Sequence, residues 1–289
     1  MKKWEEARGF DTTKDIGRGI CSSYFEWNGW YYLVSSSGYR MSREPLKPGW
    51  SWTQPENPAT QDGLGVPKVA RFQGNRYLMA GFLGGDMYAG EALFRELVQH
   101  EDGVLGTKWP AEMVPRGGAP LRFVFEPLDE GATYRGGAIR VSAPTGFSAG
   151  MVKAVPQNVR ITLRVKLATR GAAFGLCVRG EGSYEGGCEL RFEPERGRVQ
   201  CGSPAKGGMA RGSKRDSLLS SVFGIEGVSG LDQAFQLELV VKNDFVDACI
   251  DNRRTITSRR PDRPQGDRLF FFANGGEVVF EDIMVRPLL

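Results

Sequence analysis

The stretch Arg160-Ile161-Thr162-Leu163-Arg164-Val165-Lys166 alternates polar and apolar side chains without a break. Successive side chains of a β-strand point to opposite faces of a sheet, so this pattern indicates a strand with one buried face. Short strand-like stretches separated by Gly, Pro or Asn-Asp continue after it, at 173–179, 188–193, 198–202, 235–242, 245–251, 268–273 and 278–285. Strands spaced in this way are typical of a β-sandwich. We therefore predict a sandwich domain of roughly twelve strands over residues 118–289.

An earlier region, residues 1–117, has strand patterns of its own. Residues 23–27 and 30–35 are rich in strand-forming side chains, and the Asn28-Gly29 pair between them is a strong hairpin signal because both residues tolerate positive φ. A second hairpin is expected at 66–82, followed by a strand near 92–98. A short apolar helix at 91–98 is the alternative for that last segment. The whole chain is thus predicted to be all-β.

Composition excludes several classes of function. Lys and Arg together number 38 against 34 Asp and Glu, a net charge of +4, which does not favour nucleic acid as a partner. The single histidine and the absence of a Cys-x-x-Cys pair argue against zinc, and no cofactor or metal is expected. The sequence has no run of about 20 apolar residues, so no membrane-spanning segment is predicted. The sequence has 5 cysteines, an odd number, which favours free thiols in a reducing compartment. No apolar signal core is seen at the N-terminus, so a cytoplasmic protein is expected.

Three stretches, taken in order, resemble glycoside hydrolase family 32 and its relative, family 43. They are 21–33 (CSSYFEWNGWYYL), 62–82, which ends in Gly-Phe, and 92–105 (ALFRELVQHEDGVL). The segment Trp109-Pro110-Ala111-Glu112 is similar to the stretch that leads into the sandwich of that family. The resemblance covers nearly the whole chain and implies about two blades of a β-propeller at 1–117, followed by the β-sandwich.

The resemblance also indicates what is missing. The nucleophile and the transition-state-stabilising Asp of family 32 lie on blades that would precede this sequence. The acid/base Glu of the family falls at Ile20, the Asp that follows it falls at Ser23, and Phe82 takes the place of an active-site Trp. Retaining hydrolysis needs two carboxyl groups, so no catalytic residue can be named and the status as an enzyme stays open.

Binding residues can still be suggested, each against a structural alternative such as core packing, turn formation or bracing between strands. The candidate substrate-binding residues are Tyr24, Trp27, Trp30, Phe82, Asp86, Glu91 and Arg95. In the sandwich, Glu189 and Arg191 are candidates because related sandwich modules bind the ends of fructan chains.

The function expected from these observations is that of a glycoside hydrolase-like protein of the fructan-cleaving or furanoside-cleaving type, which acts on or binds carbohydrate. The alternative is a non-catalytic carbohydrate-binding or assembly module. Two blades cannot close a propeller, and an open blade edge tends to pair. We therefore expect a homo-oligomer or a partner chain that completes the propeller.

Overall fold

A computed structural model describes residues 21–35, 38–45, 52–55, 64–83, 90–169, 173–204, 219–259 and 264–288, with the backbone alone described at 219–222. The regular elements of these residues are β-strands, together with three short 3-10 helices, Gln73–Asn75, Ala111–Met113 and Pro194–Arg196. The prediction of an all-β chain is confirmed. No helix in this part of the chain has the length and hydropathy needed to cross a membrane.

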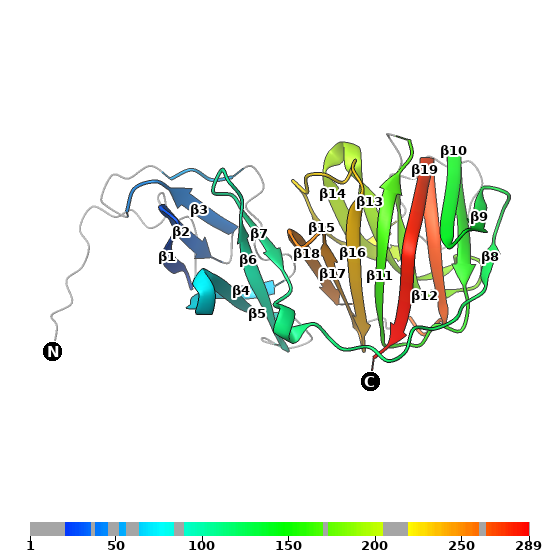
Figure 1. Ribbon diagram of the computed structural model, residues 1–289, viewed down its shortest axis with the longest axis horizontal. Coiled ribbons are helices and arrows are strands. Elements are labelled where there is room, and N and C mark those ends of the chain that lie inside the picture. The colour runs from blue at the N-terminus through cyan, green and yellow to red at the C-terminus, as the bar shows by residue number, and fades with distance from the viewer. Residues whose placement is uncertain are drawn as a thin grey trace. The chain divides into compact units, whose positions relative to one another are not determined.

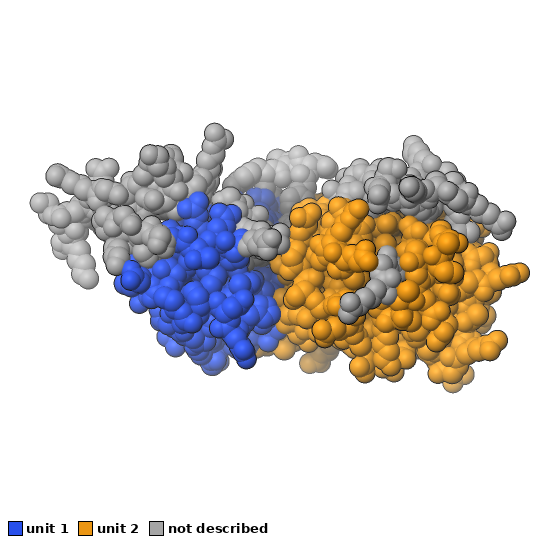
Figure 2. All heavy atoms as spheres, turned by 90° about the horizontal axis from the view of Figure 1, so that it is seen from above, with its two compact units in different colours: residues 1–110 blue, residues 111–289 orange. Residues whose placement is uncertain are grey.

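The chain divides into two compact units, residues 1–110 and 111–289, coloured separately in Figure 2. The domain boundary expected after residue 117 stays a prediction. Each unit has its own buried core, and the two are described in turn.

The first unit contains two antiparallel sheets, which are the two blades expected from the sequence (Figure 1). The strand order is β1-β2-β3 in one sheet, where Met41 also pairs with Thr53, and β4-β5-β6-β7 in the other. The strands are β1 (Ser23–Trp27), β2 (Trp30–Ser35), β3 (Gly38–Ser42), β4 (Leu64–Phe72), β5 (Arg76–Leu83), β6 (Ala92–Gln99) and β7 (Leu105–Lys108).

The predicted hairpin turn is present. Asn28 and Gly29 have φ of 50° and 73°, the left-handed values that a type I′ turn requires, and the turn pairs Trp27 with Trp30. Residues 92–99 form a strand, so the helix considered for 91–98 does not form.

The two blades share one apolar core, the blade core, made of Trp27, Tyr32, Val34, Tyr39, Met41, Leu64, Tyr77, Met79, Leu97 and Leu105. Hydrogen bonds cross the seam between the sheets. The Tyr32 hydroxyl donates to the Gly103 carbonyl at 2.7 Å, and the Gln99 amide donates to the Trp27 carbonyl at 2.9 Å. The Tyr77 hydroxyl donates to the Glu26 carbonyl at 2.6 Å. These bonds satisfy polar groups that would otherwise be buried without partners.

The second unit contains twelve strands in one hydrogen-bonded sheet, in agreement with the roughly twelve predicted (Figure 1). They are β8 (Phe125–Pro127), β9 (Ala132–Arg135), β10 (Ala138–Val152), β11 (Val159–Leu167), β12 (Ala173–Glu181), β13 (Gly186–Glu193), β14 (Arg198–Pro204), β15 (Leu219–Ile225), β16 (Phe235–Lys242), β17 (Phe245–Ile250), β18 (Arg254–Arg259) and β19 (Arg268–Pro287).

Two long strands belong to both layers of the sandwich. The first part of β19 pairs with β12 and with the second part of β10, whereas the rest of β19 pairs with β11 and with the first part of β10. Both strands change direction near glycines with positive φ, Gly146 in β10 and Gly275 in β19. Layer one is therefore β15-β14-β13-β12-β19-β10-β8, and layer two is β18-β17-β16-β11-β19-β10-β9.

Side chains from both layers fill the space between them. Phe174 and Phe192 of layer one lie with their ring centroids 6.3 and 5.4 Å from that of Phe235 in layer two. The alternating stretch 160–166 lies in β11, where Ile161, Leu163 and Val165 are fully buried in this core as predicted. The facing sides of the two layers are thus apolar, whereas the outer face of layer one carries a smaller apolar cluster of its own and polar side chains.

Candidate functional site

The structure places the candidate residues of the first unit at opposite ends of the second blade. Trp27 and Trp30 lie at the end where β6 finishes, since Gln99 bonds the Trp27 carbonyl and Gly103 lies against the Trp30 ring. Trp27 is buried in the blade core, and its ring lies 5.0 Å from that of Tyr77. Trp30 carries the Arg43 guanidinium 3.7 Å above its ring.

Phe82 and Glu91 lie together where β6 begins. The amide of Leu83 donates to the Glu91 carbonyl at 2.9 Å, and Phe82 pairs with Ala92. The Phe82 ring covers Gly65, where a Cβ atom would approach it to 2.6 Å. A strand of eight residues spans roughly 26 Å, so this pair is remote from the two tryptophans.

The remaining candidates are separate from both pairs. Arg95 is buried in the middle of β6, opposite Met79, and donates to the Phe94 carbonyl at 3.0 Å. Tyr24 is 44% exposed and stacks on Tyr31 with a centroid distance of 6.2 Å. Asp86 and Ile20 lie outside the described residues. The six candidates that the structure describes are thus not brought into one pocket, and the role of all seven in binding stays a prediction.

The carboxylate next to Arg95 has a structural role. Glu96 is buried and forms ion pairs with Arg76 at 2.5 Å and Lys108 at 3.1 Å, both on neighbouring strands of the same blade. Burial alone would raise the pKa of Glu96, but hydrogen bonds and charge from Arg76 and Lys108 outweigh it and lower the pKa. Glu96 therefore remains ionised and is unsuited to act as a general acid. Ser23 stands where family 32 has the Asp that follows its acid/base Glu. Its hydroxyl oxygen accepts a hydrogen bond from the backbone amide of Val69 at 3.2 Å.

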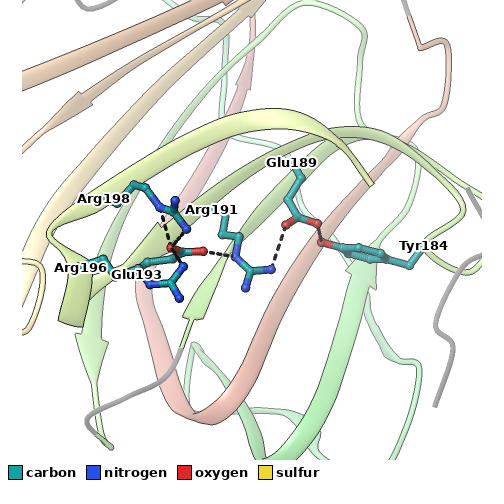
Figure 3. Close-up of polar contacts among 6 residues, drawn as sticks. All are labelled: Tyr184, Glu189, Arg191, Glu193, Arg196 and Arg198. Carbon is teal, nitrogen blue, oxygen red and sulfur yellow. Dashed lines mark hydrogen bonds and ion pairs between the residues drawn. The ribbon is translucent and has the colours of Figure 1, made fainter. Parts of the chain in front are cut away.

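A second group of polar residues lies on the outer face of layer one. Along β13, Cys188, Leu190 and Phe192 point into the core between the layers, so Glu189, Arg191 and Glu193 point the other way. Together with Arg196 and Arg198 they form the set that we call the charged row (Figure 3). Its three central side chains are almost fully buried, at 3%, 6% and 9% exposure along β13.

The contacts run along the row as a chain (Figure 3). The Tyr184 hydroxyl donates to Glu189 Oε2 at 2.6 Å, and Arg191 Nη1 lies 4.0 Å from Glu189 Oε1. Arg191 Nε donates to Glu193 Oε1 at 2.9 Å. Arg198 Nε donates to Glu193 Oε2 at 2.8 Å, and Arg196 Nη1 lies 3.6 Å from the same oxygen. Three guanidinium groups face two carboxylates, so the row carries one excess positive charge at neutral pH.

Tyr184 joins the charged row to a buried aromatic cluster. Its ring lies 4.9 Å from Phe147, 5.0 Å from Phe270 and 5.8 Å from Phe272, edge-on in each case. The residue has φ of 80°, which is rare for a large side chain and costs about 1–3 kcal/mol. This backbone conformation turns the ring onto the outer face of layer one and directs its hydroxyl to Glu189.

The row is accessible at one end. Arg196, in the short helix between β13 and β14, is 54% exposed, and the side chain of Arg198 is about a quarter exposed. The accessible end thus offers hydrogen-bond donors that a buried carboxylate, Glu193, holds in place. No group of metal ligands occurs among the residues that the structure describes.

Comparisons with known proteins bear on the fold. No protein-family model matches the sequence, and no curated protein matches it significantly. Solved structures do match over nearly all of the chain. Exo-inulinase from Aspergillus awamori covers 95% of it with a TM-score of 0.60 at 9% identity. Sucrose-6-phosphate hydrolase from Lactobacillus gasseri covers 93% with a TM-score of 0.58 at 11% identity.

The chain has a fold like that of glycoside hydrolase family 32. Fructan 1-exohydrolase IIa from Cichorium intybus is a further example, with 91% of the chain covered, a TM-score of 0.53 and 14% identity. The chain spans only 54–58% of the length of these three proteins. The likeness thus extends over the propeller-plus-sandwich architecture but includes about half of each hydrolase.

Within this glycosidase-like fold, the sequence indicated part of the charged row. Glu189 and Arg191 were candidates, whereas Tyr184, Glu193 and Arg198 were missed. The alternation of Cys188 to Glu193 could have placed Glu193 on the same face as the other two. No local sequence pattern indicates that Tyr184 reaches Glu189, because that contact depends on the left-handed backbone conformation of Tyr184 itself, in the turn before β13.

Proposed function

We propose that this protein binds fructose-containing carbohydrate, and that the exposed end of the charged row is where the sugar docks. The observation that carries the proposal is the buried Glu193 carboxylate, which holds the partly exposed guanidinium groups of Arg196 and Arg198 in place. Sugar hydroxyls accept hydrogen bonds from such donors, and donors that are already fixed lose little conformational entropy on binding. The glycosidase-like fold supports the choice of a carbohydrate over other polar ligands.

The same reasoning favours binding over hydrolysis. In the resemblance to family 32, the acid/base position is Ile20, which cannot donate a proton, and the following Asp is Ser23. Loss of general acid catalysis alone costs about 10²–10⁴-fold in rate. Catalysis by this chain would need carboxylates other than those of the family, so hydrolysis is the alternative function.

The test measures binding and turnover on one folded sample. We expect equilibrium binding to inulin or levan and no release of reducing sugar from sucrose, inulin or levan above buffer. Arg198→Gln should weaken binding about 10- to 150-fold, because one charge-assisted hydrogen bond is worth about 1.5–3 kcal/mol. Arg164→Gln, an exposed arginine on the outer face of layer two, is the matched control and should bind like the parent.

Three outcomes would contradict parts of this proposal. Absence of binding to every fructan tested would remove the function. Equal binding by the Arg198→Gln and parent proteins would place the sugar elsewhere, for instance at Tyr24 or at Phe82 and Glu91. Turnover would establish hydrolysis and would require a rebuilt active site.

We further propose that the blades associate with another protein sheet, from a second copy or a partner chain, which completes a propeller. In the first unit, β1, β4 and β7 are terminal strands of their sheets among the described residues. Strand edges of this kind pair readily unless they are covered. Light scattering over a range of concentrations should detect a species larger than 31.9 kDa. A monomer at every concentration, with and without candidate partners, would exclude this assembly.

A further inference from the structure

We propose that Cys188 and Cys201 are a site of covalent modification. On oxidation the two thiols form a disulfide bond that joins β13 to β14 in the sandwich core. The two sulfur atoms lie 3.2 Å apart, and both side chains are buried. The five cysteines of the chain are thiols in the structure. This inference does not depend on the proposed sugar site.

The strand register supports the pairing. In the β13–β14 ladder, Leu190 lies opposite Cys201 and Glu189 lies opposite Gly202. Cys188 is therefore a diagonal neighbour of Cys201 on the inner face, and the two belong to the same core cluster. An S–S bond is about 2.05 Å long, so closure needs an approach of about 1 Å. Small rotations of the two side chains can supply that approach.

The other three cysteines are poorly placed to compete. Cys177 lies on β12, on the outer face of layer one, among Phe270, Phe272 and Tyr184. Cys249 lies on β17 of layer two and contacts the Asn252 side chain. Cys21 is exposed and belongs to the first unit. The geometry therefore favours one pair of the ten that five cysteines allow.

The chemistry needs an oxidant, and a small-molecule disulfide such as glutathione disulfide is sufficient. The thiolate of one cysteine attacks glutathione disulfide, breaks its S–S bond and releases one glutathione thiolate. The second cysteine thiolate attacks the protein sulfur of the mixed disulfide and releases the second glutathione. Two protein thiols are oxidised, one disulfide is reduced, and the two thiol protons pass to the glutathione thiolates.

Burial determines when this can happen. A thiol in apolar surroundings ionises poorly and is shielded from oxidant, so the folded protein should react slowly. The crosslink should form while β13 and β14 assemble. Once formed, it would fix the register of the two strands that carry Glu193 and Arg198, directly behind the charged row.

The experiment uses the full chain with Cys21→Ser, which removes the exposed thiol. The protein is refolded in glutathione disulfide, unfolded, treated with iodoacetamide and digested for mass spectrometry. We expect alkylation of Cys177 and Cys249 only, and a peptide that links Cys188 to Cys201. Thermal unfolding should shift upward by roughly 5–10 °C relative to the reduced protein. Dithiothreitol should reverse the shift.

Two variants make the result specific. Cys201→Ala should abolish the crosslink and the thermal shift, whereas Cys249→Ala should keep both. Alkylation of Cys188 and Cys201 after refolding in glutathione disulfide would overturn the proposal. A crosslink that joins either of them to Cys177 or Cys249 would overturn it as well.

Discussion

Replacing Arg191 by methionine is expected to lower the free energy of unfolding of the second unit by about 3–5 kcal/mol. The substitution keeps most of the side-chain volume but removes the charge between Glu189 and Glu193. Both carboxylates are almost fully buried, so neither can be solvated in exchange for the guanidinium contact that it loses. Far-UV circular dichroism during chemical denaturation measures the effect, and fructan binding should be lost with it.

Arg196→Met is the matched control for that prediction. Arg196 belongs to the same row, but it is 54% exposed and lies 3.6 Å from Glu193, so its removal should cost at most about 1 kcal/mol. Adding Glu193→Gln to Arg191→Met should deepen the loss, because Arg198 then loses the carboxylate to which its Nε donates at 2.8 Å. If Arg191→Met and Arg196→Met lowered the free energy of unfolding equally, burial would not make the ion pairs of the charged row stronger.

Alkaline pH is expected to destabilise the first unit. Burial, more than any other effect, raises the pKa of Tyr32 to about 12, against 10.0 for an ordinary tyrosine. Between these values the unfolded chain has lost the phenolic proton while the folded chain keeps it, so stability falls as pH rises from 10 to 12. The loss should reach about 3 kcal/mol at pH 12 and above.

Tryptophan emission can follow this change in the first unit, because all six tryptophans lie at or before residue 109. Denaturation midpoints at pH 9 and pH 11.5 would be compared for the parent and for Tyr32→Phe. The variant lacks the hydroxyl that donates to the Gly103 carbonyl, so it should be less stable at pH 9. It should also lose less stability than the parent on going to pH 11.5. Identical pH dependence in both proteins would show that Tyr32 is not the titrating group.

The sequence predicts strands better than it predicts sites, and β11 and β6 illustrate why. Burial of Ile161, Leu163 and Val165 follows from alternation alone, because side-chain direction in a strand has a period of two. The candidates Glu91 and Arg95 are close in sequence, but an extended strand places Arg95 roughly 13 Å further along β6 than Glu91. Closeness along the chain therefore did not predict a common pocket.

The charged row illustrates the opposite case. Alternation places Glu189, Arg191 and Glu193 on one face, which can be read locally. Arg198 joins them only because a short helix with Gly197 at its end, at φ of 54°, reverses the chain in register. The contact from Tyr184 to Glu189 depends on the left-handed backbone conformation of Tyr184 itself. Unusual backbone conformations of this kind are set by tertiary packing, so residue type alone does not predict them.

The position of β19 has a consequence for biosynthesis. Among the described strands β19 is synthesised after all the others of the sandwich, yet it lies in the interior of both layers and pairs with β10, β11 and β12. While a ribosome is still adding residues 268–287, the strands that will flank β19 have no partner along that side. The nascent sandwich therefore exposes open strand edges and apolar side chains until β19 itself has been synthesised.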